Sequence, residues 1–409
     1  MYFRSKEAVK LFIFICLGFA LFPAAAFSAE NPPLAPPLTK GGEGGVTGGQ
    51  IKEYAIPTPS SNPVDIAVDA SDNIWFTEQN SNKLGKFIPS TQTFEEFDIP
   101  YKGSPVGIAV DSNSIVWLAL SADNSIISFS PAEKKFKRYK IPTADAAPYG
   151  ITMGSDDVVW FTERDGNKIG GLNAKDGSIK EYRIPTAGSQ LSGIAQDKEG
   201  IVWFIESGGN KLGSLEPKSG KIVEYVIPMP FSNPSDMAID KDGNIWFVEL
   251  NGNKLAMFSP KLRKFNEAIM PHLATVPSGI AIDKDGRIWF TENRGNRIAV
   301  FDPIQSTFTE HDIPTYRSLP LGIAIDSRGI VWFTETDRDA NKIGRIEPAV
   351  FANAGQTKAG GANLPAAAGK KFSSFLQMVE IITMIVIIII LFAGFVIWYM
   401  LRKRERKQG

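Results

Sequence analysis

Short apolar stretches alternate with turn-forming residues along residues 50–348, and this pattern returns at a nearly constant interval. A tryptophan, usually between an aliphatic residue and phenylalanine, marks each return. The steps between Trp75, Trp117, Trp160, Trp203, Trp246, Trp289 and Trp332 are 42, 43, 43, 43, 43 and 43 residues. Several short strands in a period of this length are typical of a β-propeller with one repeat per blade. The sequence therefore predicts an all-β fold, a seven-bladed β-propeller.

Each repeat divides into four expected strands, which in the first repeat cover 64–69, 74–78, 83–88 and 94–99. The last repeat stops after its third strand, while an unmatched fourth strand at 51–57 precedes the first repeat. We expect that N-terminal strand to complete the last blade, because ring closure removes the exposed edges of an open array. The tryptophan of each repeat is expected to pack between neighbouring blades and is given no ligand role.

The N-terminal end has the order of a secretory signal. Basic residues precede an apolar run over 11–22, and small residues follow it. We expect a signal peptide over residues 1–29, with an uncleaved anchor as the alternative. Cys16, the one cysteine of the chain, lies inside this run, so a cleaved chain has no thiol. Residues 30–49 are rich in proline and glycine and are expected to form a linker.

The C-terminal end has the pattern of a membrane span. An uncharged, isoleucine-rich run over 381–401 is long enough to cross a bilayer, and we expect a transmembrane helix over 378–401. Residues 349–377 are rich in alanine and glycine and would be a tether. The basic tail at 402–409 predicts a cytoplasmic C-terminus. The propeller would then lie on the extracytoplasmic side, periplasmic or outer, of a bacterial-type cytoplasmic membrane crossed once. A buried helix of a soluble protein is the alternative.

Charge and histidine content exclude some classes of function. Residues 50–348 contain 32 Lys+Arg and 39 Asp+Glu, a balance of −7, which does not favour a nucleic-acid surface. His272 and His311 are the two histidines, and neither begins a first strand. No Cys/His cluster for zinc and no Gly-x-Ser-x-Gly or phosphate loop occurs. We expect a monomeric propeller that binds no nucleic acid.

Two polar patterns recur with the repeat. A glutamate ends six of the tryptophan strands, and an Asn-Lys or Asn-Arg pair follows each; the glutamates are Glu78, Glu163, Glu206, Glu249, Glu292 and Glu335. They could form a ring of carboxylates, but a repeated turn with left-handed asparagines is favoured, because one ligand cannot use six equivalent sites. The Asp-x-Asp-Gly turns at 240–243 and 283–286 lack the further ligands of a calcium loop and are expected to be hairpin turns.

The first strand of each blade should line the central channel, and its start breaks the symmetry of the repeat. The residues there are Val64, Val106, Tyr149, Ser192, Ser235, Ser278 and Leu321. Two blades place Asp65 and Asp236 where the others have glycine. A specific site must break symmetry, so Asp65, Tyr149, Ser235 and Asp236 are the candidate ligand-binding residues; drift on a solvated rim is the alternative. Asp65 and Asp236 lie four blades apart, on nearly opposite sides of the ring, which argues against a shared metal ion.

The repeat, with "EYxIPTP", "PxGIAVD", "NIWFTE" and "NKIGRI", resembles the virginiamycin B lyase (streptogramin lyase) family over residues 50–348. The resemblance implies a seven-bladed propeller with a ligand site at the channel mouth. It also implies a carbon-oxygen elimination that opens cyclic depsipeptide antibiotics, with magnesium, a histidine and nearby glutamates.

The residues of that chemistry are missing here. The family's histidine begins a first strand in a Glu-Pro-His-Gly-Ile setting that no blade has, and Tyr149 alone matches a motif that contacts substrate in the family. We therefore assign no catalytic residue and no metal ligand. The favoured function is a membrane-anchored extracytoplasmic propeller that binds a small molecule, glycan or envelope protein at the channel mouth. The alternatives are a lyase acting on a cyclic depsipeptide or related ester through other residues, with magnesium, and a structural module that bridges envelope proteins.

Overall fold

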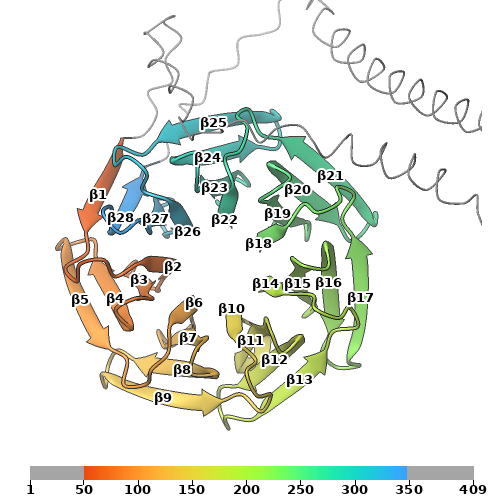
Figure 1. Ribbon diagram of the computed structural model, residues 1–409, viewed down its shortest axis with the longest axis horizontal. Helices are drawn as coiled ribbons and strands as arrows, with labels where there is room; N and C mark the ends of the chain where they lie inside the picture. The colour runs from red at the N-terminus through yellow and green to blue at the C-terminus, as the bar shows by residue number, and fades with distance from the viewer. Residues whose placement is uncertain (1–49, 348–409) are drawn as a thin grey trace, which may run out of the picture. The chain divides into compact units, whose positions relative to one another are not determined.

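The computed structural model describes residues 50–347, which form seven four-stranded antiparallel sheets arranged as blades around a central channel (Figure 1). This arrangement confirms the expected seven-bladed propeller. The expected signal peptide, linker, tether, transmembrane helix and basic tail lie outside the described residues. Within residues 50–347, no helix is long and apolar enough to cross a membrane.

Each blade runs outward from an inner strand. The inner strands are β2 (Pro63–Val68), β6 (Pro105–Val110), β10 (Pro148–Met153), β14 (Leu191–Gln196), β18 (Pro234–Ile239), β22 (Pro277–Ile282) and β26 (Pro320–Ile325). The second strands are β3 (Ile74–Glu78), β7 (Val116–Leu120), β11 (Val158–Glu163), β15 (Val202–Glu206), β19 (Ile245–Glu249), β23 (Ile288–Glu292) and β27 (Val331–Glu335). The blades are numbered 1 to 7 in the order of these inner strands.

The two remaining strands of each blade face outward. The third strands are β4 (Lys83–Ile88), β8 (Ser125–Ser130), β12 (Lys168–Asn173), β16 (Lys211–Glu216), β20 (Lys254–Ser259), β24 (Arg297–Asp302) and β28 (Lys342–Ile346). The outer strands are β5 (Thr93–Asp98), β9 (Lys135–Lys140), β13 (Ile179–Arg183), β17 (Lys221–Val226), β21 (Lys264–Ile269) and β25 (Thr307–Asp312), with β1 (Ile51–Ala55) in blade 7. A short 3-10 turn, η1 (Ser155–Asp157), lies between β10 and β11.

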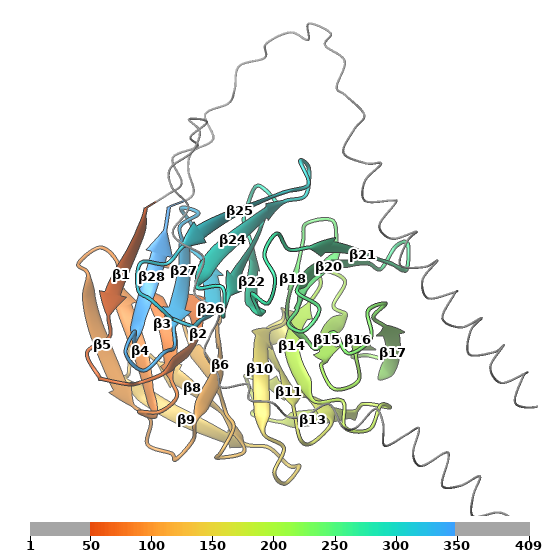
Figure 2. The same cartoon turned by 45° about the horizontal axis from the view of Figure 1, so that its top comes forward.

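The N-terminal strand closes the ring as expected. β1 pairs antiparallel with β28, with Ile51 opposite Ile346 and Ala55 opposite Lys342. Both views of the ring place β1 beside β28, although these strands stand at opposite ends of the domain sequence (Figures 1 and 2). Blade 7 is therefore the sheet β1-β28-β27-β26, built from both ends of the domain.

The first inner strand begins one residue earlier than the apolar pattern predicts, at Pro63. Proline is tolerated there because a strand's first residue can do without a donor. The pairing with β3 shifts register between Pro63 and Ile66, which marks a bulge. The pairing of the inner and second strands has the same register shift at the same place in each of the other six blades. The bulge holds the residues that begin each inner strand, including all the candidate site residues.

The apolar core lies between the blades, not within each blade. Trp117 of blade 2, for example, belongs to one buried cluster with Val159, Phe161 and Leu172 of blade 3. Seven such clusters follow the ring within the described residues. The tryptophans therefore pack between neighbouring blades, as expected from their fixed place in the repeat.

The Asp-x-Asp-Gly segments are hairpin turns, and the first aspartate of each is already occupied. Asp283 Oδ1 accepts the backbone N–H groups of Asp285 (3.0 Å) and Arg287 (2.9 Å). Its Oδ2 accepts the indole N–H of Trp289 at 2.9 Å. These bonds join the turn to the interblade core. Blade 3 has Gly154 at this position, and there the indole nitrogen of Trp160 has no partner among the described residues.

Candidate functional site

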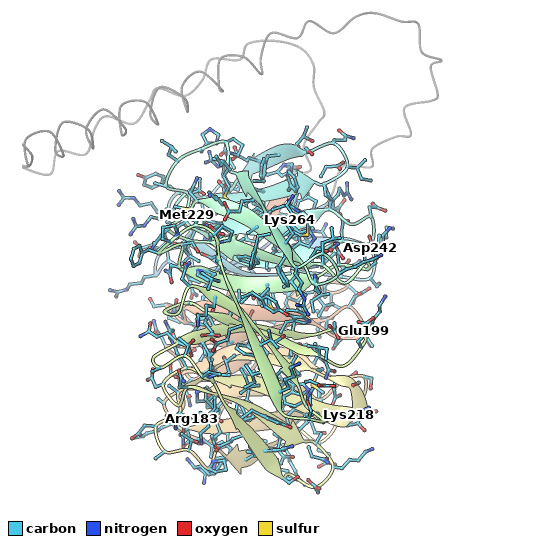
Figure 3. The ribbon with its side chains drawn as sticks, turned by 90° about the vertical axis from the view of Figure 1, so that its right-hand side faces the viewer. Arg183, Glu199, Lys218, Met229, Asp242 and Lys264 are labelled. Atoms are coloured by element: carbon cyan, nitrogen blue, oxygen red, sulfur yellow. The ribbon has the colours of Figure 1, made fainter. Side chains whose placement is uncertain are left out.

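The inner strands begin at one face of the ring, which we call the upper face. It comprises the crossovers from each outer strand to the next inner strand and the loops between second and third strands. Figure 3 shows the ring edge-on, with Met229 and Arg183 toward this face and Asp242, Glu199 and Lys218 toward the opposite one. The upper face therefore carries the symmetry-breaking positions predicted from the sequence.

A cavity of about 120 Å3 lies in the channel and is lined by all seven inner strands. The four candidate residues Asp65, Tyr149, Ser235 and Asp236 all line it. A water molecule needs roughly 10–15 Å3 of such space, so the cavity can hold several waters or one small chemical group. The structure thus brings together residues from blades 1, 3 and 5.

Glycine in the inner strands reflects their close approach around the channel. A Cβ atom placed on Gly107 would lie 2.3 Å from the carbonyl oxygen of Tyr149 in the next blade. The same distance separates a Cβ on Gly150 from the carbonyl oxygen of Ser192. Real Cβ atoms do not come so close to a backbone oxygen, so a side chain at these positions would force the strands apart. Blades 1 and 5 depart from this rule with aspartate.

Each aspartate connects its own inner strand with the inner strand of the next blade. Asp65 Oδ1 accepts the N–H of Ile66 (2.9 Å), and Oδ2 accepts the N–H of Ile108 (3.0 Å). Asp236 repeats this geometry, with Oδ1 bonded to Met237 N–H (2.8 Å) and Oδ2 to Ile280 N–H (3.2 Å). Both carboxyl groups are therefore positioned by backbone donors and are held at the cavity wall.

The two carboxyl groups interact electrostatically across the channel. Burial raises the pKa of Asp65 to about 6. Burial, together with the negative charge of Asp65, raises the pKa of Asp236 to about 7. Backbone N–H groups favour the charged form, but they offset the burial only in part. The carboxyl groups of blades 1 and 5 thus line the same cavity, and the charge of Asp65 affects the titration of Asp236.

A magnesium ion does not fit these donors. Each oxygen of Asp65 and Asp236 already accepts a backbone N–H. Within residues 50–347, no three His, Cys, Asp or Glu side chains converge as possible metal ligands. Hard cations such as Mg²⁺ require several oxygen ligands, so no residues are assigned to a metal ion.

Tyr149 forms the third wall of the cavity and has a cationic neighbour. The Arg164 guanidinium lies over its ring, 4.9 Å from the centroid. Burial raises the pKa of the Tyr149 hydroxyl; Arg164 opposes this shift, while Asp65 and Asp236 add to it. Arg164 was not predicted as a site residue. The sequence does distinguish Arg164, because it is the charged residue among the seven that directly follow the tryptophan strands.

Ser235 takes part in the site through its backbone. Its carbonyl oxygen accepts the hydroxyl of Ser192 at 2.7 Å. The Ser207 hydroxyl lies 2.8 Å from that of Ser192 and donates to the carbonyl oxygen of Pro234 at 2.6 Å. In blade 1 a threonine makes the equivalent link, since Thr77 Oγ1 accepts the Asp65 N–H and donates to Val106 O. Ser192 and Ser207 thus replace the threonine link and add hydroxyl groups beside the cavity.

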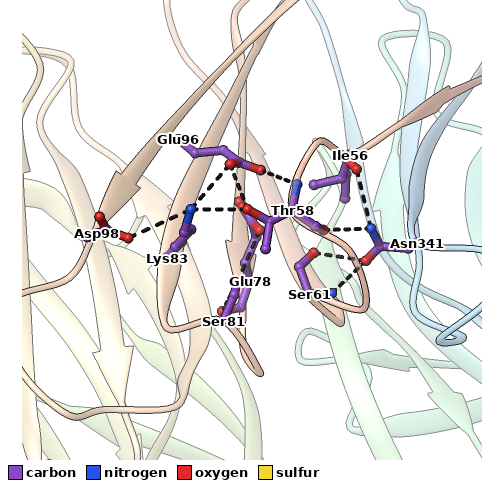
Figure 4. Close-up of polar contacts among 9 residues, drawn as sticks. All are labelled: Ile56, Thr58, Ser61, Glu78, Ser81, Lys83, Glu96, Asp98 and Asn341. Carbon is purple, nitrogen blue, oxygen red and sulfur yellow. Dashed lines mark hydrogen bonds and ion pairs between the residues drawn. The ribbon is translucent and has the colours of Figure 1, made fainter.

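The repeated glutamates are buried under the upper-face loops and do not form an open ring of ligands. In blade 1 the side chain of Glu78 is fully buried, and Ser81 donates to it at 3.1 Å (Figure 4). Lys83 pairs instead with Glu96 of the outer strand at 3.4 Å, and Glu96 also accepts the Thr58 N–H at 2.9 Å (Figure 4). We call such a group of two glutamates, one basic residue and a crossover residue an interblade carboxyl cluster. The outer-strand Glu96, not the repeated Glu78, therefore bonds the loop amide of Thr58.

The repeated asparagines confirm the expected turn. Asn82 has a left-handed φ of 56°. Its Nδ2 donates to the carbonyl oxygens of Ile99 (3.0 Å) and Tyr101 (2.9 Å), and its Oδ1 accepts the N–H of Gly103 (3.1 Å). One side chain thus fixes the whole crossover that leads to the next inner strand. Asn341 fixes the crossover after β1 in the same way, with bonds to Ser61 and Thr58 (Figure 4).

Neither histidine lines the cavity. His311 stacks on Trp289 with ring centroids 6.1 Å apart, and burial lowers its pKa. His272 Nδ1 lies 2.7 Å from Glu310 Oε2, in the interblade carboxyl cluster of blade 6. Both histidines therefore contact residues of the repeat outside the cavity.

Comparisons with known proteins agree on one family. The profile of the Virginiamycin B lyase family matches residues 44–258 and 134–353. The chain is 44% identical to the virginiamycin B lyase of Bacillus licheniformis over 41 residues, which are 10% of this chain and 14% of that relative. This stretch therefore spans a small part of the curated relative.

Two solved structures extend the comparison over the whole propeller. One, described as a streptogramin B lyase structure, is 30% identical with a TM-score of 0.70, over 74% of this chain and 98% of that one. The other is catalytically inactive virginiamycin B lyase from Staphylococcus aureus with quinupristin, 30% identical with a TM-score of 0.68 over 72% and 98%. The family profile alone covers more than half of the chain, and the chain belongs to the virginiamycin B lyase family.

Proposed function

We propose that this protein is a membrane-anchored, extracytoplasmic binding propeller that holds a ligand at the mouth of its central channel. One observation carries the proposal: Asp65, Tyr149 and Asp236, from three different blades, converge on one cavity. These residues break the symmetry of the repeat at the place where the inner strands begin. A pocket with a few convergent polar groups is the usual form of a small-molecule site.

The chemistry of the wall favours a ligand with hydrogen-bond donors or a positive charge. Two carboxyl groups face the cavity, and none of its lining residues is basic. Tyr149 offers an aromatic face on which Arg164 already lies. A donor-rich group entering from the upper face would meet Asp65 and Asp236 below and Tyr149 at the side.

Quinupristin is a suitable first probe, because the S. aureus relative was solved with it. We expect the purified full-length protein to bind it in calorimetric titrations. A variant with Asp65→Asn, Tyr149→Ala and Asp236→Asn should bind at least roughly tenfold more weakly, the loss typical of contacts in a buried polar site. The exposed Glu199→Gln variant is the control. Equal affinity of the triple variant would refute the site, and no binding by the parent would refute a streptogramin-type ligand.

A lyase is the second candidate, and family membership favours it. An elimination needs a base close to the proton that it removes. The pKa of Asp236, raised to about 7, suits a base near neutral pH. The test is to incubate the protein with quinupristin and magnesium and to follow ring opening by reversed-phase chromatography and fragmentation. Opening above the protein-free rate, lost in Asp236→Asn, would support a lyase that uses a residue other than histidine.

The membrane location is supported by the sequence alone. The apolar run at 381–401 and the basic tail after it predict one anchor with an extracytoplasmic propeller. Removal of residues 378–409 should release the protein from the membrane fraction. Continued sedimentation of that variant with membranes in alkaline carbonate would contradict the anchor.

A further inference from the structure

Large hydrophobic side chains gather on one arc of the upper face. Five residues are prominent among the exposed hydrophobic residues of the described chain: Val226 (69% exposed), Phe231 (85%), Ile269 (63%), Leu273 (88%) and Tyr316 (67%). They lie at or just after the ends of β17, β21 and β25, on the crossovers into blades 5, 6 and 7. We call them the apolar rim. Three consecutive crossovers thus expose large apolar side chains on the upper face.

The repeat does not require these side chains. The position of Val226 and Ile269, the last residue of an outer strand, holds Asp98, Lys140, Arg183 and Asp312 in other blades. The position of Phe231 holds Ser60 in blade 7's crossover to blade 1 and Gly188 in the crossover to blade 4. Polar or small residues therefore suffice for the fold at these places.

The backbone gives no reason for the phenylalanine either. Phe231 has a left-handed φ of 56°, a conformation that bulky L-residues adopt rarely. Its side chain is 85% exposed, so it adds little to the core. A bulky residue in an unfavourable conformation without burial indicates that something outside the described chain contacts it.

Within the upper-face loops around the apolar rim the charged residues have one sign, and Asp312 at the end of β25 is an exposed acidic residue next to them. The upper-face loops of this arc, residues 207–210, 227–233, 250–253, 270–276, 293–296 and 313–319, contain no aspartate or glutamate. They contain His272 and the exposed Arg294 and Arg317, the last of which lies over the Tyr316 ring at 5.2 Å. The loops of the other blades contain Asp123, Asp145, Asp165, Asp337 and Asp339. Exposed Phe, Leu and Tyr with arginine and few carboxylates are typical of segments that enter an anionic lipid interface.

We propose that the apolar rim docks the propeller onto an anionic lipid bilayer. Phe231, Leu273 and Tyr316 enter the headgroup region, and Arg294 and Arg317 contact lipid phosphates. The inference uses the proposed membrane location for its setting. The chain leaves the domain at the opposite face, where Ile51 pairs with Ile346. The expected tether at 349–377 can extend to roughly 100 Å, enough to pass the side of a domain whose strands are about 20 Å long.

The experiment needs no anchor. The seven interblade clusters and the closing pair β1-β28 all lie within residues 50–347, so this domain contains everything that its fold requires. The domain is mixed with vesicles of phosphatidylcholine, with or without phosphatidylglycerol, and separated by flotation. The test variant is Phe231→Ser, Leu273→Ala and Tyr316→Ser. The matched control is Leu262→Ser and Ile304→Ser, two exposed residues in turns at the opposite face.

We expect the parent domain and the control variant to float with the anionic vesicles and much less with pure phosphatidylcholine. The test variant should partition at least roughly tenfold more weakly, since binding scales with buried apolar area. Thermal melts of the test variant serve to check that it folds, and high salt should weaken the binding of the parent domain.

Three results would overturn the proposal. The first is that the parent domain does not float with the vesicles, and the second is that the test variant floats as well as the parent. In the third, the parent binds no vesicles, and light scattering shows it to be a dimer while the test variant is a monomer. The last result would make the rim an interface between two copies. The channel variant with Asp65→Asn and Asp236→Asn should float normally, which separates failure of the rim from failure of the proposed ligand site.

Discussion

Glu163 allows a sharp test of what the interblade carboxyl clusters do to stability. Its side chain is fully buried at the end of β11, and neither carboxyl oxygen has a hydrogen-bond partner within the described residues. Lys168 pairs with Glu181 instead, at 2.6 Å. Burial and the negative charge of Glu181 raise the pKa of Glu163 to about 7. The perturbation is Glu163→Gln, which keeps the shape and removes the charge.

The size and sign of the effect follow from that pKa. A rise from 4.5 to about 7 corresponds to about 3 kcal/mol between the two protonation states. Because the folded-state pKa is raised, Glu163 contributes no penalty below pH 4.5, and its penalty grows as pH rises to about 7. Local opening of the loop after β11 admits water and reduces the effect, so we expect roughly 1–3 kcal/mol. Glu163→Gln should therefore be more stable than the parent at pH 8, and the difference should be much smaller at pH 5.

The assay is urea or thermal unfolding of residues 50–347 at several pH values between 5 and 8. Glu199→Gln is the control, since that carboxylate is 61% exposed in a turn of the opposite face.

The partner glutamate of the same cluster has the opposite pH dependence. Burial alone would raise the pKa of Glu181, but the hydrogen bonds from Lys168 and Thr143 hold it below the ordinary value. Glu181 therefore stabilises the fold above its ordinary pKa and loses this effect in acid. A Glu163→Gln variant that is less stable than the parent at pH 8 would refute the reasoning.

Three further predictions concern closure, the turns and the channel. Deletion of residues 50–57 should abolish cooperative unfolding or lower the melting temperature of the domain by roughly 10 °C or more, because blade 7 loses its outer strand; a truncation that melts like the parent would contradict the closure. Asp283→Ala should cost roughly 2–3 kcal/mol in urea unfolding, because it leaves the buried indole N–H of Trp289 and two turn amides without their acceptor, whereas Asp285→Ala should change little. Binding of a cationic ligand in the channel should strengthen as pH rises from 5 to 8, because the pKa values of Asp65 and Asp236 are raised to about 6 and about 7 and both carboxyls ionise in this range; a calorimetric affinity independent of pH would argue against contact with these groups.

The sequence predicts the fold well because its signals are local and repeated. The tryptophan period gives the blade count, and the unmatched strand before the first repeat predicts the partner of β28. Shifts of a single residue, such as the start of β2 at Pro63, arise from the bulge, which the apolar pattern does not reveal.

The site is harder to predict because it depends on distances across the channel. The inner strands approach closely, as the space around Gly107 shows, and Asp65 and Asp236 line one cavity and interact electrostatically although they belong to blades 1 and 5. Arg164 lies over Tyr149 because β11 ends beside the start of β10, and this contact has no motif in the sequence. The outer-strand glutamates, such as Glu96, were missed since their strands show only simple alternation.

The pairing of β1 with β28 also sets the order in which the domain can be completed. The first strand of the domain to be synthesised meets its partner only when residues 342–346 have followed, almost 300 residues later. Six of the blades can assemble against their neighbours in turn, but β1 has no partner strand until β28 has been made. Contacts of such large sequence separation form slowly, and an unpaired strand in a partly made chain invites aggregation. The slowest and most vulnerable step in the folding of this domain is therefore expected at its end, when β1 and β28 first meet.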